Sequence, residues 1–93
     1  MKDRAIFYQK LKVQLDETTK FPSDYLFKFI VSAEGNKAEQ LQEIFENKDA
    51  ALTKKKSKTG KYISISIVIK LANSNAVISY YQKAEQIEGI ISL

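Results

Sequence analysis

The sequence contains no cysteine and no histidine. Without cysteine the chain has no disulfide, no thiolate metal site and no thiol nucleophile. Without histidine it lacks the side chain that most often acts as a general base near neutral pH and most often binds a metal ion. Most hydrolytic, triad and zinc chemistries are thereby excluded, so we expect a protein that is not an enzyme and has no cofactor.

Glycine and proline are also scarce, at three residues and one residue, in a chain of 93 residues that is 44% hydrophobic and 28% charged. This composition is typical of a folded protein, and a chain of this length supports one core. We expect a single domain over residues 1–93, in which residues 1–20 form an N-terminal helical extension.

No hydrophobic run approaches the roughly 20 residues that span a bilayer, and the N-terminus has no apolar signal segment. We therefore expect no membrane association and a cytoplasmic location.

Arginine is nearly absent, because Arg4 stands alone against fourteen lysines in a chain of net charge +4. Residues 48–61 contain six lysines and one aspartate, a local charge of +5. The basic character therefore belongs to one segment, and the rest of the chain is close to neutral.

Residues 3–18 are predicted to form an amphipathic helix, with Phe7, Leu11 and Leu15 on one stripe beside Tyr8. A short strand is the alternative over residues 11–15, where apolar and polar residues alternate. Either element ends before Phe21-Pro22, because the residue before proline is disfavoured in a helix.

Residues 25–32 are rich in aromatic and β-branched side chains and are predicted to form a strand. If Lys28 faces solvent, then Leu26 and Ile30 do too, because side chains alternate along a strand. The inward side chains are then Tyr25, Phe27, Phe29 and Val31.

The remaining elements follow from turn and capping signals. We expect a helix at 37–47, strands near 50–57 and at 62–71, a helix at 75–86 and a strand at 87–93. Asn36 with Glu39 resembles a capping box, and Asn73-Ser74 caps the later helix. Three sets of side chains should face inward: Ala38, Leu41, Ile44 and Phe45; Ile63, Ile65, Ile67, Ile69 and Leu71; and Val77, Tyr80 or Tyr81, and Ala84.

Apart from the N-terminal helix, the order is strand, helix, strand, strand, helix, strand. Two such βαβ halves interleave into a four-stranded antiparallel sheet with both helices on one face. The sequence therefore predicts an α+β fold, the ferredoxin-like βαββαβ sandwich.

The lysine-rich hairpin allows two registers. An even-numbered loop around Thr59-Gly60 gives the pairs Lys54–Ile65 and Lys56–Ile63, and places two ammonium groups on the core side at a cost. An odd-numbered loop gives the pairs Lys54–Ser64 and Lys56–Tyr62, and leans Lys55 toward the core side near the sheet edge. We expect the odd-numbered loop.

Three sets of residues are candidate sites. The turn at Gly35 and Asn36 precedes a helix and is a candidate site for a small anionic ligand, with an ordinary turn and helix cap as the alternative. A possible anion patch comprises Lys54, Lys56, Lys58, Lys61 and Tyr62. A possible association face comprises Leu26, Ile30 and Val68, which the N-terminal helix, a second copy in a homodimer, or both would cover.

Nucleic-acid binding through the lysines is the weaker hypothesis. Phosphate and base recognition favours arginine, and Ser64 and Ser66 follow Tyr62 on the outward side, so a stacking platform is missing. Any such contact would be weak and governed by charge.

Several segments resemble the YbeD-like family of small bacterial proteins. They are Phe21-Pro22, the strand from Tyr25 to Val31 with Phe27-Lys28 inside it, and Gly60-Lys61-Tyr62 followed by Ser64-Ile65-Ser66-Ile67. The resemblance covers residues 7–93 and implies a ferredoxin-like fold close to ACT regulatory domains, which bind small ligands and often pair through their sheets.

We therefore expect a non-enzymatic, ACT-like regulatory or protein-interaction module that binds an unknown protein partner or a small effector. The alternative is weak polyanion binding through the hairpin at 54–61. A structural or assembly protein without an effector is the third class.

Overall fold

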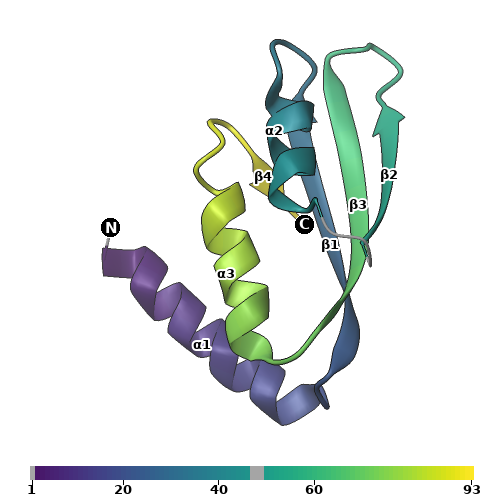
Figure 1. Ribbon diagram of the computed structural model, residues 1–93. Helices are drawn as coiled ribbons and strands as arrows, with labels where there is room; N and C mark the ends of the chain where they lie inside the picture. Colours follow the sequence, from purple (N-terminus) through teal and green to yellow (C-terminus); the bar gives the residue numbers. More distant parts are fainter. Residues whose placement is uncertain (1, 47–49) are drawn as a thin grey trace.

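The computed structural model describes residues 2–46 and 50–93. Its elements are α1 (Lys2–Thr18), β1 (Ser23–Ser32), α2 (Lys37–Ile44), β2 (Ala51–Lys56), β3 (Tyr62–Leu71), α3 (Ser74–Ala84) and β4 (Ile91–Ser92) (Figure 1). The four strands form an antiparallel sheet in the order β2-β3-β1-β4. This is the ferredoxin-like arrangement, and the predicted fold class is confirmed.

The predicted faces of β1 and β3 are also confirmed. Phe27 lies directly opposite Ile67, and Phe29 lies opposite Ile65, with all four side chains at most 1% exposed. Leu41 of α2 and Val77 of α3 complete the core against this inner face and are fully buried.

An aromatic cluster holds α2 and α3 on the sheet. The ring of Phe27 lies 5.0 Å from the rings of Phe45 and Tyr81, and Phe45 stacks on Tyr80 at 4.6 Å. The prediction left open which tyrosine faces the core, and both Tyr80 and Tyr81 pack against it.

The largest differences from the predicted limits are at α2 and at the last strand. α2 ends at Ile44, and residue 47, where the helix was expected to end, lies outside the described residues. The last strand is only Ile91–Ser92, because Gly89 turns the chain with a φ of +75° and Ile87 is buried in the core before that turn.

Of the two helix N-caps that the sequence predicted, one is confirmed. Asn73 caps α3 by accepting a hydrogen bond from the backbone N–H of Ala76 at 2.9 Å. The capping box predicted at Asn36 is wrong, because Asn36 makes no side-chain cap bond and instead accepts from Gln40 Nε2 at 2.8 Å.

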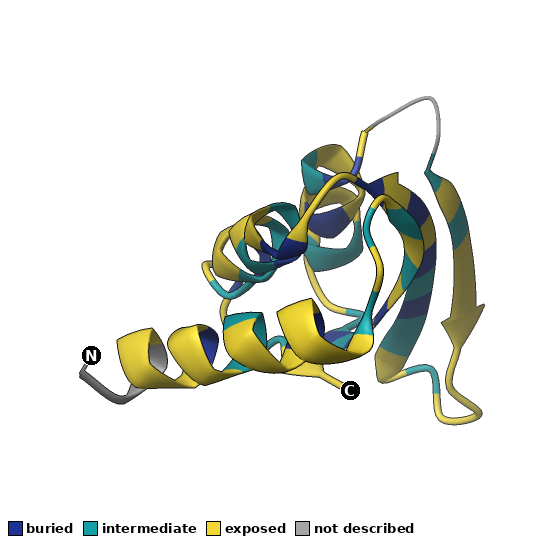
Figure 2. Cartoon of the chain, turned by 90° about the horizontal axis from the view of Figure 1, so that it is seen from below, coloured by how far each residue is buried: buried dark blue, intermediate teal, exposed yellow. Residues whose placement is uncertain are grey.

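α1 is helical as predicted, but its buried stripe is shifted. Tyr8 and Leu15 are 7% exposed, whereas Phe7 is 52% exposed. The helix packs against α3, where the Tyr8 hydroxyl donates to Glu85 and the Ser74 hydroxyl donates to Asp16 at 2.6 Å. α1 therefore lies on the helical side of the sheet and does not cover the opposite face, contrary to one of our expectations (Figures 1 and 2).

The predicted hairpin register is wrong. The backbone N–H of Ser57 donates to the carbonyl of Tyr62 at 2.8 Å, which closes a four-residue loop over 58–61, and Gly60 supplies a φ of +74°. The resulting pairs are Lys54–Ile65, Lys55–Ser64 and Lys56–Ile63. This register is tolerated because β2 is an edge strand in which only Leu52 is half-buried, so lysines on its inner side still reach water.

Candidate functional site

Within residues 2–46 and 50–93, no helix covers the face of the sheet opposite α2 and α3, and we call this face the outer face. Strand alternation and the registers place these side chains on it: Asp24, Leu26, Lys28 and Ile30 of β1; Ala51, Thr53 and Lys55 of β2; Tyr62, Ser64, Ser66, Val68 and Lys70 of β3; and Ile91 of β4. The outer face thus combines aliphatic groups, hydroxyl groups and lysines.

The aliphatic side chains of the outer face form neighbouring pairs. Leu26 lies opposite Val68, and these side chains are 55% and 40% exposed. Ile30 is half-buried and lies opposite Ile91, which is 49% exposed. The predicted association face is therefore continuous with β4, which sequence reasoning did not include.

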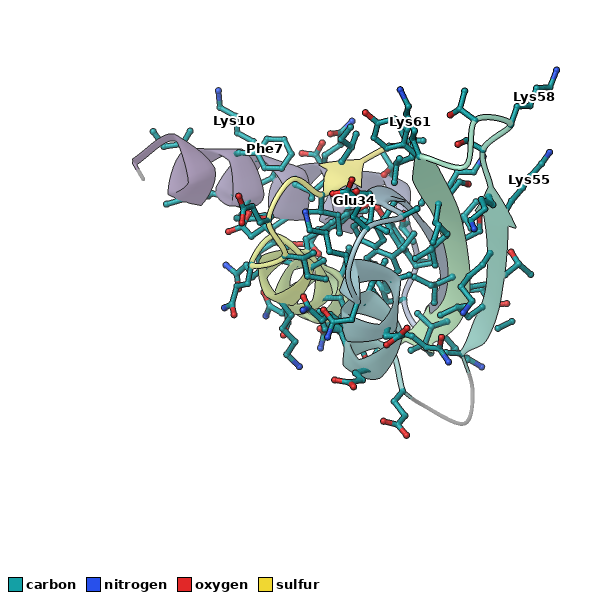
Figure 3. The ribbon with its side chains drawn as sticks, turned by 90° about the horizontal axis from the view of Figure 1, so that it is seen from above. Phe7, Lys10, Glu34, Lys55, Lys58 and Lys61 are labelled. Carbon is teal, nitrogen blue, oxygen red and sulfur yellow. The ribbon has the colours of Figure 1, made fainter. Side chains whose placement is uncertain are left out.

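Two hollows adjoin on the basic half of the outer face. One has a volume of about 360 Å³ and is lined by Lys28, Thr53, Lys54, Lys55, Ser64 and Ser66. The other has a volume of about 380 Å³ and is lined by Ile30, Lys55, Lys56, Ser57, Lys58, Tyr62 and Ser64. Lys55 and Lys58 project from the hairpin on the side away from α2 (Figure 3).

The pairing of β2 with β3 separates the residues of the predicted anion patch, so that they do not share one face of the sheet. Lys54 reaches toward α2, where its ammonium group donates to Gln42 Oε1 at 3.2 Å. Tyr62 instead lies on the outer face and is 51% exposed. Lys58 and Lys61 lie in the hairpin loop between the two strands.

Sequence reasoning did not include Lys28 and Lys55 in a site, although these two lysines flank the hydroxyl groups of Ser64 and Ser66. Lys28 lies opposite Ser66 and Lys55 lies opposite Ser64, so both share the outer face with these serines. The outward direction of Lys28 was already predicted, and pairing it with the serines would have identified this half of the surface.

The predicted ligand turn is open. Gly35 has a φ of +69° and is exposed, and a Cβ atom placed on it would meet nothing within 4 Å. Asn36 is also exposed, and its side-chain oxygen accepts a hydrogen bond from Gln40 of α2. The backbone N–H of Ala33, just before this turn, donates to the carbonyl of Lys61 at 2.8 Å, so the hairpin loop lies beside it.

A third hollow of about 390 Å³ lies on the helical side, between α1, α3 and β4. Its lining is Phe7, Tyr8, Leu11, Phe29, Tyr81, Glu85, Ile90, Ser92 and Leu93. Burial is the main cause that raises the pKa of Tyr81 well above its ordinary range, and a hydrogen bond with Tyr25 is the second cause. This hydroxyl is therefore protonated at neutral pH.

Two kinds of site are absent from the part of the chain that the structure describes. Its aspartate and glutamate side chains form no group of three or more that could hold a metal ion. Within residues 2–46 and 50–93, no helix is both long enough and apolar enough to span a bilayer.

These features define a small α+β domain with a ferredoxin-like sheet that is open on one face. The chain belongs to the family described as "Protein of unknown function (DUF493)", whose model matches residues 16–93. The match begins near the end of α1, so nearly all of this helix precedes the part shared with the family. The resemblance noted from the sequence holds at this level, that of a family of unknown function.

A solved structure supports the fold. The chain is similar to the solution structure of protein HP0495 from H. pylori, with 20% sequence identity and a TM-score of 0.61, over 82% of this chain and 86% of that chain. At this identity the likeness establishes the fold alone. None of the curated proteins matches this chain.

Proposed function

We propose that the protein is a non-enzymatic interaction module that binds an acidic segment of a partner protein on the outer face of its sheet. The observation that carries this proposal is the exposure of Leu26 and Val68 on a face that also carries Lys28 and Lys55 and that no helix of the described residues covers. Exposed apolar groups rimmed by charged groups are typical of protein interaction sites.

The charges of the outer face favour an acidic partner. β1 and β3 each place one lysine there, Lys28 and Lys70, and the hairpin adds Lys55 and Lys58 near Tyr62. Asp24 is the one acidic side chain among the outer-face residues named above. A segment that alternates aliphatic residues with aspartate or glutamate would match both the apolar pairs and the lysines.

A second copy of the chain matches this face less well. Two outer faces stacked on each other would bring the lysines of both copies together, and like charges across an interface cost several kcal/mol, by an order-of-magnitude estimate. We therefore do not propose the homodimer that the sequence led us to expect.

Nucleic acid also matches less well. Tyr62 is the one aromatic side chain among the outer-face residues, so successive bases would have no second ring on which to stack. Leu26 and Val68 would remain exposed against a phosphate backbone, and lysine lacks the bidentate geometry of arginine.

The resemblance to ACT regulatory domains supports a regulatory form of this proposal. Binding on the outer face would favour one conformation of the partner and shift its populations by the difference in affinity between its two states. No chemistry by this chain is required.

The proposal can be tested by selection from a library of random displayed peptides. We expect the wild-type protein to enrich peptides that alternate aspartate or glutamate with aliphatic residues, and the double variant Lys28→Glu/Lys55→Glu to lose them. The matched control, Lys10→Glu on the exposed side of α1, should retain them.

Three results would overturn the proposal. They are enrichment of peptides without acidic residues, equal binding by the double variant, and equal competition by single-stranded oligonucleotides at physiological salt. Circular dichroism of each variant before selection ensures that lost binding reflects the surface and not the fold.

A further inference from the structure

The middle of the outer face carries three hydroxyl side chains between two lysines. In one row across the sheet, Lys28 lies opposite Ser66, and Ser66 lies opposite Thr53. In the next row, Ser64 lies opposite Lys55. We propose that these five side chains, the hydroxyl–lysine site, bind the phosphoryl group of a phosphorylated serine or threonine in the partner segment. This inference rests on the proposed function and names the acidic group that this part of the outer face recognises.

The polar groups of the hydroxyl–lysine site are not engaged by other parts of the protein. Within the described ranges 2–46 and 50–93, none of the five side chains forms a hydrogen bond or an ion pair. All five line the hollow of about 360 Å³ on the outer face. Ser64 and Ser66 are half-buried, whereas Lys28, Thr53 and Lys55 are exposed. The two serine hydroxyls therefore lie deeper in this surface than the lysines, and all of these donors are available to a ligand.

A phosphoryl group matches the donors and the charge of this site better than a carboxylate does. Each hydroxyl and each ammonium group can donate a hydrogen bond, and a phosphoryl group offers three strong acceptor oxygens where a carboxylate offers two. The charge of a phosphoryl group at pH 7 is about −1.5 to −2, whereas a carboxylate carries a single negative charge. The phosphoryl group therefore balances the charges of Lys28 and Lys55 together.

The neighbours of the site favour a phosphorylated protein segment over a free phosphate ion. Leu26 and Val68 form the next row of the outer face, and they are 55% and 40% exposed. Asp24, which would repel an anion, lies one row further away. Side chains two residues apart in an extended segment point to the same side and are about 7 Å apart, which is also the spacing of neighbouring rows in the sheet. A segment with an aliphatic residue two positions from the phosphorylated residue would therefore contact both rows.

Three peptides test this inference by isothermal titration calorimetry with the full chain. Each peptide alternates valine with glutamate, and its central acidic position is occupied by serine, glutamate or phosphoserine. The phosphoserine peptide should bind about tenfold more tightly than the glutamate peptide at physiological salt, because it accepts more charge-assisted hydrogen bonds. The serine peptide should bind more weakly than both. Inorganic phosphate at an equal concentration should not displace the phosphoserine peptide, because the ion makes no contact with Leu26 and Val68.

Removing the hydroxyl groups provides the matched variants. Ser64→Ala/Ser66→Ala should weaken binding of the phosphoserine peptide about tenfold, to the level of the glutamate peptide, and change binding of the glutamate peptide by less than about twofold. Ser79→Ala, on the exposed side of α3, is the control and should change neither. If the double variant does not fold, Thr53→Val on the edge strand removes the third hydroxyl group and should reduce the preference for phosphoserine about threefold.

The outcomes separate this inference from the proposed function. Equal affinity for the glutamate and phosphoserine peptides, an unchanged preference in a folded hydroxyl variant, or displacement by an equal concentration of inorganic phosphate would overturn this inference and leave the proposed function in place. If none of the three peptides binds, both are overturned.

Discussion

The hydroxyl groups of Tyr25 and Tyr81 lie 3.0 Å apart and join β1 to α3 at the margin of the core. Their rings meet edge to face, with 6.3 Å between centroids. The pair therefore couples the sheet to the helix through both a polar and an aromatic contact, beside the hollow that Tyr81 lines.

This pair predicts a specific loss of stability at alkaline pH. Burial, and then the hydrogen bond with Tyr25, raises the pKa of Tyr81 in the folded state above its ordinary value of 10.0. The folded state holds the proton more tightly than the unfolded state, so the stabilisation is complete below the ordinary pKa and is lost as pH rises through the folded one. Tyr81→Phe should lose less stability between neutral pH and about pH 11 in urea unfolding. Equal losses in both proteins would contradict this assignment.

A second polar contact secures α1. Hydrogen bonds, first from the Ser74 hydroxyl and then from the Lys12 ammonium group, hold the pKa of Asp16 below its ordinary value of 3.8. The contribution is present above that value and is lost as pH falls through the folded pKa. Asp16→Asn should therefore speed amide exchange in α1 at neutral pH, and the difference from wild type should vanish in acid. Its neighbour Glu17→Gln is the control, and equal effects of the two substitutions would refute this contact.

Two leucines give a matched test of burial. Leu41 of α2 is fully buried, whereas Leu26 is 55% exposed on the outer face. Leu41→Ala should lower the free energy of unfolding by about 2–5 kcal/mol, because it removes packed methyl groups and leaves a cavity. Leu26→Ala should change it by less than about 0.5 kcal/mol. Denaturant unfolding measures both, and a comparable loss at Leu26 would mean that another part of the structure covers the outer face.

The hairpin register can be measured directly. Because Ser57 and Tyr62 form a hydrogen-bonded pair, the pairs Lys54–Ile65 and Lys56–Ile63 are of the closer type without hydrogen bonds between them. Their Hα atoms should show strong cross-strand NOEs. NOEs of this kind from Lys54 to Ser64 and from Lys56 to Tyr62 would instead restore the odd-numbered loop.

The faces of the central strands could be predicted because a single charged residue determines them. Once Lys28 faces water, the alternation of β1 turns Phe27 and Phe29 into the core, and β3 follows from its isoleucines. The same reasoning failed for β2, because it assumed that the inner side of this strand is buried. An edge strand covers little, so Lys54 can face inward and still meet solvent and Gln42.

The position of α1 could not be predicted from its periodicity. The spacing of its apolar residues allows Phe7, Leu11 and Leu15 to form a stripe, but the contact of Tyr8 with Glu85 rotates the helix and exposes Phe7. That contact joins residues 77 positions apart in the chain. For the same reason the hollow beneath α1 was not anticipated, whereas the exposed pair of Leu26 and Val68 was.

Photo-crosslinking in living cells measures whether the outer face binds an acidic segment of another protein. A photoreactive residue at position 68 should cross-link to a partner segment rich in aspartate or glutamate and aliphatic residues, as identified by mass spectrometry. The cross-link should disappear when Lys28→Glu/Lys55→Glu is added, and the same probe at Val13 on α1 should not capture that segment. Cross-links from position 68 only to nucleic acid, only to a second copy of the chain, or to no partner would contradict the account.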